Sequence, residues 1–151
     1  MESQHQVILS LGSNLGNRLE NIFSCIQLIH QEIGTVIKTS KLYATPSWGF
    51  DSEEFYNCAL VLHTFSPAEK ILTQILSIET QLGRIRNNDN AYHSRIIDID
   101  LIAFDEAVLN TEELIIPHPL MQNRKFVLLP MRDLNLDWKH PVFHKNILQN
   151  Y

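Results

Sequence analysis

The sequence predicts an α+β fold with two helices on one face of an antiparallel sheet and a C-terminal extension of short elements. Two segments carry apolar residues at helical spacing, and each follows a segment with the pattern of a β-strand. Two further strand-like segments complete the order β-α-β-β-α-β, which is the ferredoxin-like sandwich. The chain has 151 residues, of which 44% are hydrophobic, and we expect a single domain over residues 1–151.

The sequence pattern of the first part of the chain predicts a strand, a helix and a second strand. Residues 7–11 are a short apolar run, and Gly12-Ser13-Asn14 after it predicts a tight turn. Asn17 is placed to begin a helix, and Gly34 is placed to end it in a left-handed conformation. Residues 35–43 are rich in β-branched types, which predicts the second strand. The apolar positions of the helix are Ile22, Cys25, Ile26, Ile29 and Ile33.

A third strand and a second helix follow. Residues 55–65 alternate between two sets of side chains, as a strand with two different faces does. The helix after it has the clearest start signal, with Ser66 as the capping residue, Pro67 at the first helical position and Glu69 at the third. Apolar residues then recur at helical spacing until Gly83, which predicts the end of the helix.

Two aspartates stand on the otherwise apolar strand predicted for residues 96–104. Asp98 and Asp100 are separated by one residue, so both side chains should point to the same face, roughly 6.6 Å apart along the strand. Two desolvated carboxylates repel each other unless a positive charge lies between them, and Mg²⁺ prefers such oxygen ligands. Taken alone, the pair is equally compatible with a solvated sheet face or with neutralisation by nearby arginines.

Three arginines favour a phosphoryl-transfer site around this pair. Arg84, Arg86 and Arg95 lie in the segment that leads to the strand, and carboxylates combined with guanidinium groups are what phosphoryl transfer requires. Ordinary surface charge would account for the same arginines. The polar residues between them suggest a loop that closes over a substrate. The common glycine-rich nucleotide-binding signatures are absent from the sequence.

Composition argues against several classes of function. A formal net charge of −5 and a pI near 5.7 argue against a general nucleic-acid binder. Cys25 and Cys58 stand far apart among apolar neighbours, which predicts buried free thiols and neither a disulfide nor a metal site. No stretch approaches the ~20 apolar residues that span a bilayer, and the N-terminal residues lack the pattern of a signal peptide. We expect a cytoplasmic protein without membrane or nucleic-acid partners.

Several short motifs run through the chain between residue 7 and about residue 130. They are Leu11-Gly12-Ser13-Asn14-Leu15-Gly16-Asn17-Arg18, Tyr43-Ala44-Thr45-Pro46, Phe55-Tyr56-Asn57, Glu79 with Leu82-Gly83-Arg84-Ile85-Arg86, Ser94-Arg95-Ile96-Ile97-Asp98-Ile99-Asp100-Leu101, Ile116-Pro117-His118-Pro119 and Asn123-Arg124-Lys125-Phe126. In their order and approximate spacing they resemble the 6-hydroxymethyl-7,8-dihydropterin pyrophosphokinase family of folate biosynthesis. The segment from Arg95 to Asp100 is the most specific of them.

The resemblance implies a magnesium-dependent transferase, a nucleotide-binding kinase that moves pyrophosphate from ATP to 6-hydroxymethyl-7,8-dihydropterin. The products would be AMP and the pterin diphosphate ester. Two Mg²⁺ ions are implied on Asp98 and Asp100, and ATP is the co-substrate. Arg84 and Arg95 are implied, with the two aspartates, as catalytic residues that stabilise the transferring group. The family also implies a monomer, and here residues 1–151 would be a single pterin pyrophosphokinase domain.

The resemblance further implies the residues of the two substrate sites. Phe55 and Phe126 would sandwich the pterin ring, and Asn57 would read its polar edge. The pterin site would be lined by Thr45, Pro46, Trp48, Phe55, Asn57 and Phe126. The ATP site would be formed by Glu79, Arg84, Arg86, Tyr92, Arg95, Leu101, His118, Pro119 and Arg124.

Two other interpretations stay open at the level of the sequence. A Mg²⁺-dependent phosphohydrolase would use the same aspartates and release phosphate. A non-enzymatic ferredoxin-like binding module would need neither the metal nor ATP. An RNA-binding module of this fold should carry aromatic residues and basic charge on its central strands, whereas we expect a central strand with two aspartates here.

Overall fold

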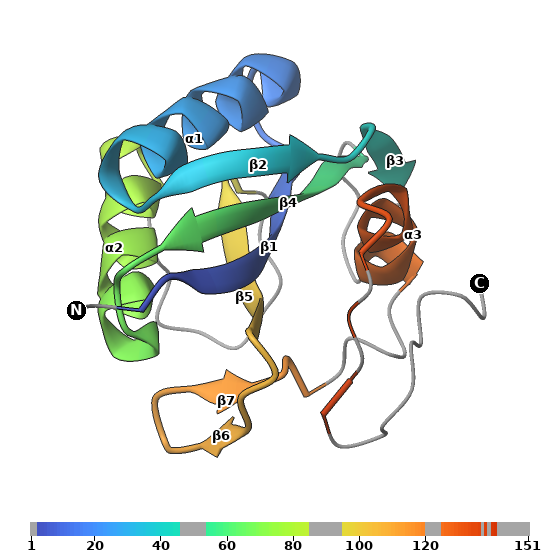
Figure 1. Ribbon diagram of the computed structural model, residues 1–151. Coiled ribbons are helices and arrows are strands. Elements are labelled where there is room, and N and C mark those ends of the chain that lie inside the picture. The colour runs from blue at the N-terminus through green and yellow to red at the C-terminus, as the bar shows by residue number, and fades with distance from the viewer. Residues whose placement is uncertain are drawn as a thin grey trace.

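A five-stranded antiparallel sheet forms the centre of the structure, which is a computed structural model (Figure 1). Its strands are β1 (His5–Ser13), β2 (Thr35–Thr39), β3 (Tyr43–Thr45), β4 (Phe55–Thr64) and β5 (Asp98–Phe104). The main path has the order β2-β4-β1-β5, and β3 also pairs with β4. The strand of the two aspartates, β5, is therefore an edge of this path and not the central strand that we expected. The structure describes residues 3–45, 54–84, 95–119, 125–136, 138 and 140–141.

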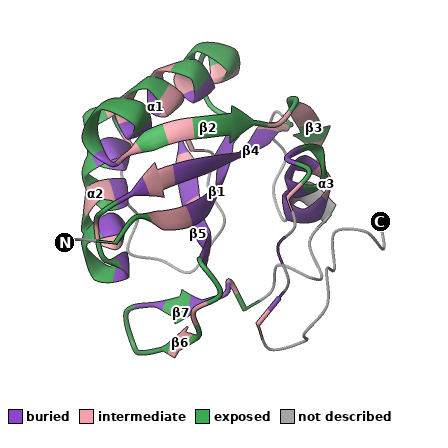
Figure 2. Cartoon of the chain, in the orientation of Figure 1, coloured by how far each residue is buried: buried purple, intermediate pink, exposed green. Residues whose placement is uncertain are grey.

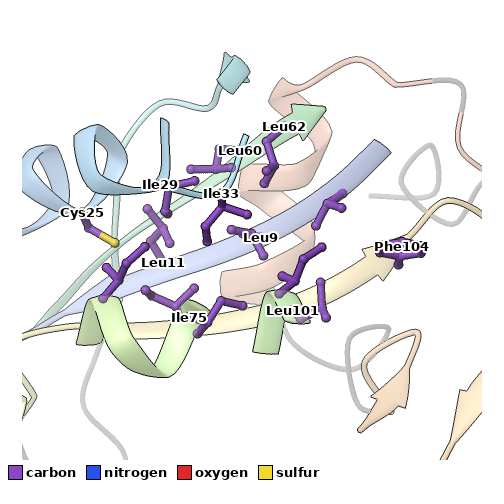
Figure 3. Close-up of a cluster of buried hydrophobic side chains, with 14 of the residues drawn as sticks. Leu9, Leu11, Cys25, Ile29, Ile33, Leu60, Leu62, Ile75, Leu101 and Phe104 are labelled. Carbon is purple, nitrogen blue, oxygen red and sulfur yellow. The ribbon is translucent and has the colours of Figure 1, made fainter. Parts of the chain in front are cut away.

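Two helices cover one face of the sheet, which confirms the predicted ferredoxin-like sandwich. They are α1 (Arg18–Glu32) and α2 (Ala68–Gln81), and they contact each other (Figure 1). Apolar side chains from both helices and from β1, β4 and β5 fill the space between the layers (Figure 3), while the outer faces of the helices are exposed (Figure 2). This cluster, called the first core here, includes Leu9, Leu11, Ile29, Leu60, Leu62 and Ile75.

The C-terminal extension forms a partial layer on the opposite face. Helix α3 (Lys125–Asp133) packs there, and the small sheet of β6 (Leu109–Asn110) and β7 (Ile115–Ile116) precedes it in the chain (Figure 1). A second core lies beneath α3 and consists of Ile8, Ala59, Val61, Ile102, Ala103, Val127, Leu128, Met131, Leu134 and Trp138. The two long helices thus cover one face of the sheet, and α3 covers a part of the other.

The strand predicted over residues 35–43 is divided into β2 and β3. Ser40 lies between these two strands and makes two hydrogen bonds with the backbone of Ala59 in β4. Its amide donates to the carbonyl of Ala59 at 2.8 Å, and its hydroxyl accepts from the amide of Ala59, also at 2.8 Å. The chain can therefore interrupt the strand without leaving the buried Ala59 amide unpaired.

Gly12 and Ser13 belong to β1, so the predicted turn at Gly12-Ser13-Asn14 was wrong. Gly12 is paired with β4 on one side and with β5 on the other. A Cβ atom at this position would lie 3.1 Å from Oδ1 of Asn57 and 3.4 Å from Cδ1 of Phe55. The glycine therefore marks a close approach within a central strand, which is its other common role in sheets.

The two helix starts had different outcomes. Asn17 caps α1 as predicted, and its side chain accepts from the amide of Glu20 at 3.1 Å. The prediction of Ser66 as the cap of α2 was wrong, because Pro67 is the N-cap and no side chain caps this helix. The amide of Ser66 instead donates to Oγ1 of Thr64 at 3.1 Å, which ties the residue to the end of β4.

The glycine at each helix end has a separate cause. Gly83 follows α2 with a φ of 97°, the left-handed conformation that favours glycine. Gly34 has no positive φ, so the left-handed ending predicted for α1 was wrong. A Cβ atom on Gly34 would overlap the carbonyl oxygen of His63 and lie 2.8 Å from Cβ of Thr64. Gly34 is needed because the chain passes against β4.

Cys25 and Cys58 are buried free thiols, as predicted. Burial raises the pKa of Cys58 to about 12. Burial also raises the pKa of Cys25, and the nearby charges of Cys58 and Glu79 raise it further. Neither thiol is therefore suited to nucleophilic chemistry near neutral pH. In the part of the chain that the structure describes, no helix has the length and hydropathy to cross a bilayer.

Candidate active site

Three neighbouring strands bring Asn57, Gly12 and Asp98 into one row across the sheet. Gly12 is paired with Asn57 of β4 and with Asp98 of β5, and two positions along β1 Ser10 is paired with Asp100. Directly opposed residues of antiparallel strands project to the same face, so the row presents an amide, a gap and a carboxylate. We call the three residues Asn57, Gly12 and Asp98 the site row.

Asp98 and Asp100 share one face, as their spacing predicted. Ile97, Ile99 and Leu101 alternate with them and are buried in the first core. Both aspartates are only partly buried, so they lie on the face opposite α1 and α2. This is the face that α3 covers in part.

Two guanidinium groups hold the carboxylate of Asp98. Nη1 of Arg84 lies 3.0 Å from Oδ1 of Asp98, and Nη1 of Arg95 lies 3.2 Å from its Oδ2. Neutralisation by arginines, one of the alternatives that the sequence left open, is therefore present at Asp98. The same contacts gather two cations and an aspartate at one point, which is the arrangement that a polyphosphate requires.

The C-terminal end of α2 positions Arg84. Gly83 turns the chain out of the helix, and the amide of Arg84 donates to the carbonyl of Glu79 at 3.0 Å. The guanidinium then returns toward the helix, where Nη1 lies 2.6 Å from Oε2 of Glu79. The side chain of Arg84 is 12% exposed, so it reaches Asp98 from a fixed and largely buried position.

Asn14 positions Arg95 across a sequence separation of 81 residues. The amide of Arg95 donates to Oδ1 of Asn14 at 2.7 Å, and the amide of Asn14 donates to the carbonyl of Arg95 at 3.0 Å. Asn14 is 2% exposed and directly follows β1. The pair of hydrogen bonds fixes the backbone of Arg95 just before β5, and with it the position from which the Arg95 side chain extends.

The donor set around Asp98 and Asp100 fits a magnesium ion that is shared with a substrate. No group of three or more possible protein ligands occurs among the residues that the structure describes. Mg²⁺ in phosphate-binding enzymes commonly takes one or two carboxylates and completes its octahedron with water and phosphate oxygens. Two carboxylates on one face, with guanidinium groups beside them, suit that mode and not an all-protein cage.

Three of the residues expected at the pterin site, Thr45, Phe55 and Asn57, meet at the other end of the site row. Nδ2 of Asn57 donates to Oγ1 of Thr45 at 2.7 Å, which fixes the orientation of the amide. Thr45 is paired with Phe55 across β3 and β4. The ring of Phe55 is partly exposed, and Asn57 is 4% exposed. An aromatic face and an oriented amide therefore stand on the same strand.

Other expected site residues have varied positions. Glu79 is 2% exposed beneath Arg84, and the side chain of Leu101 is buried in the first core, away from the aspartates. The amide of His118 donates to the carbonyl of Ile102 at 2.9 Å, which places His118 along β5, and Pro119 is exposed. Outside the described residues lie Pro46, Trp48, Arg86, Tyr92 and Arg124, and of Phe126 only the backbone in α3 is described.

Two residues of this site were not among those expected from the sequence. Both had been placed in a turn after the first strand, and neither stood among the expected pterin, ATP or metal residues. A signal for both was present, because a Gly-Ser-Asn run directly after an apolar strand is also compatible with a strand that continues to a ligand site. The contacts that decide the matter come from β4 and from Arg95.

The fold and this constellation define a ferredoxin-like α+β domain with a carboxylate and guanidinium centre of the kind used on phosphate groups. Residues 8–136 match the model of the 7,8-dihydro-6-hydroxymethylpterin-pyrophosphokinase (HPPK) family. The chain belongs to this family.

Individual relatives agree with the family assignment. The chain is 36% identical over 138 residues to 2-amino-4-hydroxy-6-hydroxymethyldihydropteridine pyrophosphokinase of Porphyromonas gingivalis, covering 89% of this chain and 93% of that protein. It is 39% identical over 137 residues to the folic acid synthesis protein fol1 of Pneumocystis carinii, covering 90% of this chain. The match spans only 18% of the length of the Pneumocystis protein and 21% of a similar Dictyostelium discoideum protein.

Solved structures agree on the fold. The HPPK-DHPS crystal structure of Plasmodium falciparum, as the wild type with pteroate, matches with a TM-score of 0.77 at 19% identity. The match covers 99% of this chain and 42% of that one. A triple-mutant structure of the same protein gives a TM-score of 0.78 at 18% identity, with coverages of 99% and 43%. At this identity the likeness supports the arrangement of helices and strands.

The family assignment bears on the three interpretations of the sequence. The family is named for a pyrophosphokinase, which favours that interpretation over the phosphohydrolase and the non-enzymatic binding module. The motif-based resemblance to the family is confirmed.

Proposed function

We propose that this chain transfers the terminal pyrophosphoryl group of ATP to the hydroxymethyl group of 6-hydroxymethyl-7,8-dihydropterin in folate biosynthesis. The observation that carries the proposal is the site row. It sets an oriented amide and a carboxylate held by two arginines about two strand spacings apart, roughly 10 Å. That separation suits a flat heterocycle at one end and a polyphosphate at the other.

The pterin ring would lie against Phe55, with its polar edge toward Asn57. The hydrogen bond from Nδ2 of Asn57 to Thr45 leaves Oδ1 as the atom that faces the gap above Gly12. Oδ1 can accept from an N–H group of the heterocycle. Stacking on the aromatic face would add affinity that does not depend on charge.

The phosphates would lie at the opposite end of the site row. Arg84 and Arg95 can donate to phosphate oxygens and stabilise negative charge on the transferring group. Asp98 and Asp100 would hold Mg²⁺, which supplies neutralisation of the phosphate charge when it is bound. Arg86, Tyr92, His118, Pro119, Leu101 and Arg124 remain proposed ATP contacts.

The proposed reaction is a single displacement at the β-phosphorus. The substrate hydroxyl oxygen forms a bond to the β-phosphorus, the bond from that phosphorus to the oxygen shared with the α-phosphate breaks, and AMP leaves. The hydroxyl proton is released to solvent. The protein residues orient the two substrates in line and hold their charges, and no covalent intermediate with the protein is required.

Three further properties belong to the proposal: turnover that depends on Mg²⁺, a monomeric chain of one domain, and a cytoplasmic location. Size-exclusion chromatography with light scattering tests the monomer, and removal of Mg²⁺ with EDTA tests the metal. Activity that survives EDTA would contradict the metal dependence.

The first experiment is to incubate the protein with Mg²⁺, ATP and 6-hydroxymethyl-7,8-dihydropterin and to identify the nucleotide product by chromatography. AMP that forms only when the pterin is present is the expected result. ADP, or phosphate release that does not depend on the pterin, would instead support the phosphohydrolase. Asp98→Asn should abolish AMP formation, whereas Glu113→Gln, which changes an exposed carboxylate before β7, should leave it unchanged.

A further inference from the structure

Glu79 is a buried carboxylate that accepts hydrogen bonds from two donors, the guanidinium of Arg84 and the amide of Ile99. Its side chain is 2% exposed, and Oε2 lies 2.6 Å from Nη1 of Arg84 and accepts from the amide of Ile99 at 2.9 Å. A buried carboxylate is costly unless it is paired and hydrogen-bonded. Both donors belong to the neighbourhood of Asp98, because Arg84 contacts Asp98 and Ile99 follows it in β5.

Arg84 is shared between two carboxylates. The same atom, Nη1, contacts Oε2 of Glu79 at 2.6 Å and Oδ1 of Asp98 at 3.0 Å. The remaining oxygen of Asp98 faces Arg95. A cation that binds Asp98 must therefore compete with guanidinium groups for the same oxygen atoms.

We propose that Glu79 is a positioning residue that retains Arg84 when Asp98 binds a divalent cation. This inference rests on the proposed function, in which Asp98 holds that cation. With Glu79 ionised, Arg84 keeps a carboxylate partner after it gives up Asp98, so the exchange costs little. If the charge of Glu79 is removed, Asp98 is the carboxylate that remains for Arg84 among the described residues. Arg84 then stays on Asp98 and opposes the binding of the cation more strongly. Glu79 thus acts through Arg84 and needs no contact with ATP.

The test uses Mn²⁺ as the probe and follows its free concentration by electron paramagnetic resonance, without nucleotide. Glu79→Gln keeps a side-chain oxygen for the Ile99 amide and removes the charge that holds Arg84. We expect the variant to bind Mn²⁺ on the order of tenfold more weakly than the wild type. An unchanged Mn²⁺ affinity would overturn the inference while leaving the proposed function intact.

A double-mutant cycle separates positioning from a direct effect of the Glu79 charge. Arg84→Gln removes the competitor, so this variant should bind Mn²⁺ at least as tightly as the wild type. In the Arg84→Gln background, Glu79→Gln should then change the affinity less than about twofold. A tenfold loss in that background would mean that Glu79 acts on the cation itself, which overturns the inference. If Glu79→Gln does not fold, weaker Mn²⁺ binding by Arg84→Gln alone also overturns it.

Asp98→Asn distinguishes failure of the inference from failure of the proposed function. This variant should weaken Mn²⁺ binding more than any other variant of the set. If Asp98→Asn binds Mn²⁺ with wild-type affinity, Asp98 holds no cation, and both the inference and the proposed function are contradicted. Kinetics give a further readout. Glu79→Gln should lower kcat and leave the KM for the pterin near its wild-type value, because Arg84 lies at the phosphate end of the site row. A loss confined to that KM would contradict the proposed role.

Discussion

Asn57 and Asp98 lie in the same row of the sheet, with only the backbone of Gly12 between them. Gly12 has no side chain to fill the space, and the neighbouring atoms there are Oδ1 of Asn57 and Cδ1 of Phe55. On the proposed function, this gap is where the hydroxymethyl group of the pterin passes from the amide end of the row to the phosphate end.

Gly12→Ala should weaken pterin binding with little effect on nucleotide binding. The added Cβ atom would lie 3.1 Å from Oδ1 of Asn57 and would push the amide or the Phe55 ring by a few tenths of an ångström. We expect the Kd for the pterin to rise about tenfold, the equivalent of roughly one hydrogen bond. Fluorescence titration measures it, with ATP affinity of the same variant as the control. Equal pterin affinities in variant and wild type would contradict the proposal that the pterin uses the space above Gly12.

Gly34→Ala should destabilise the protein by about 1–3 kcal/mol, because its Cβ atom would overlap the carbonyl of His63. Gly83→Asn provides the contrast. Gly83 has a positive φ, which asparagine adopts more readily than most residues, and a Cβ atom there would make only an ordinary contact, 3.4 Å from Cδ1 of Ile96. Urea denaturation should show the larger loss for Gly34→Ala. The reverse order would mean that the close approach of Gly34 to β4 is not what constrains it.

Ser40→Ala should cost about 1–3 kcal/mol of unfolding free energy, because the buried amide of Ala59 loses its acceptor. Ser40→Thr keeps the hydroxyl and should retain most of the stability. Ser77→Ala, on the exposed side of α2, should fall within about 0.5 kcal/mol of the wild type. Thermal or urea unfolding compares the three, and a neutral Ser40→Ala would show that water or a shift of β3 satisfies the amide.

The buried thiols should make the protein less stable as the pH rises above 9. Burial raises the pKa of Cys58 from its ordinary value of 9.0 to about 12. Between these values the unfolded chain has lost the proton and the folded chain has kept it. The stabilising contribution is therefore complete below pH 9 and is lost as the pH rises toward 12, at up to about 1.4 kcal/mol per pH unit for each thiol.

Cys58→Ala tests this pH dependence. Urea midpoints between pH 8 and 10.5 should fall less steeply in the variant than in the wild type, whatever its stability at pH 8. The Cys25 thiol, whose pKa is also raised by burial, should account for part of the remaining slope. Parallel curves for variant and wild type would show that Cys58 ionises equally in both states.

Patterns that depend on near neighbours could be predicted from the sequence. The alternation of residues 55–65 became the two faces of β4, and the spacing of Asp98 and Asp100 placed both on one face. The cap at Asn17 was also local, since its partner is Glu20. In each case the structure is decided within a few residues, where periodicity and side-chain chemistry are informative.

Features that depend on distant contacts could not be predicted. Gly34 is required by the carbonyl of His63, and Gly12 by the side chains of β4. Asn14 holds Arg95, which stands 81 positions later. Glu79 accepts from the amide of Ile99, which stands 20 positions later in β5. Such partners are set by the pairing of strands, which no local window contains.

The second core stops where the site row begins. Ile8, Ala59 and Val61 are covered by α3, whereas Asp98 remains partly exposed on the same face. A pterin seated on Phe55 would extend this apolar layer, so substrate would complete a part of the protein's own interior. Ligand at a hundred times its Kd would add about 2.7 kcal/mol to the free energy of unfolding. Under the proposed function, the cellular abundance of this chain should therefore follow the supply of its substrates.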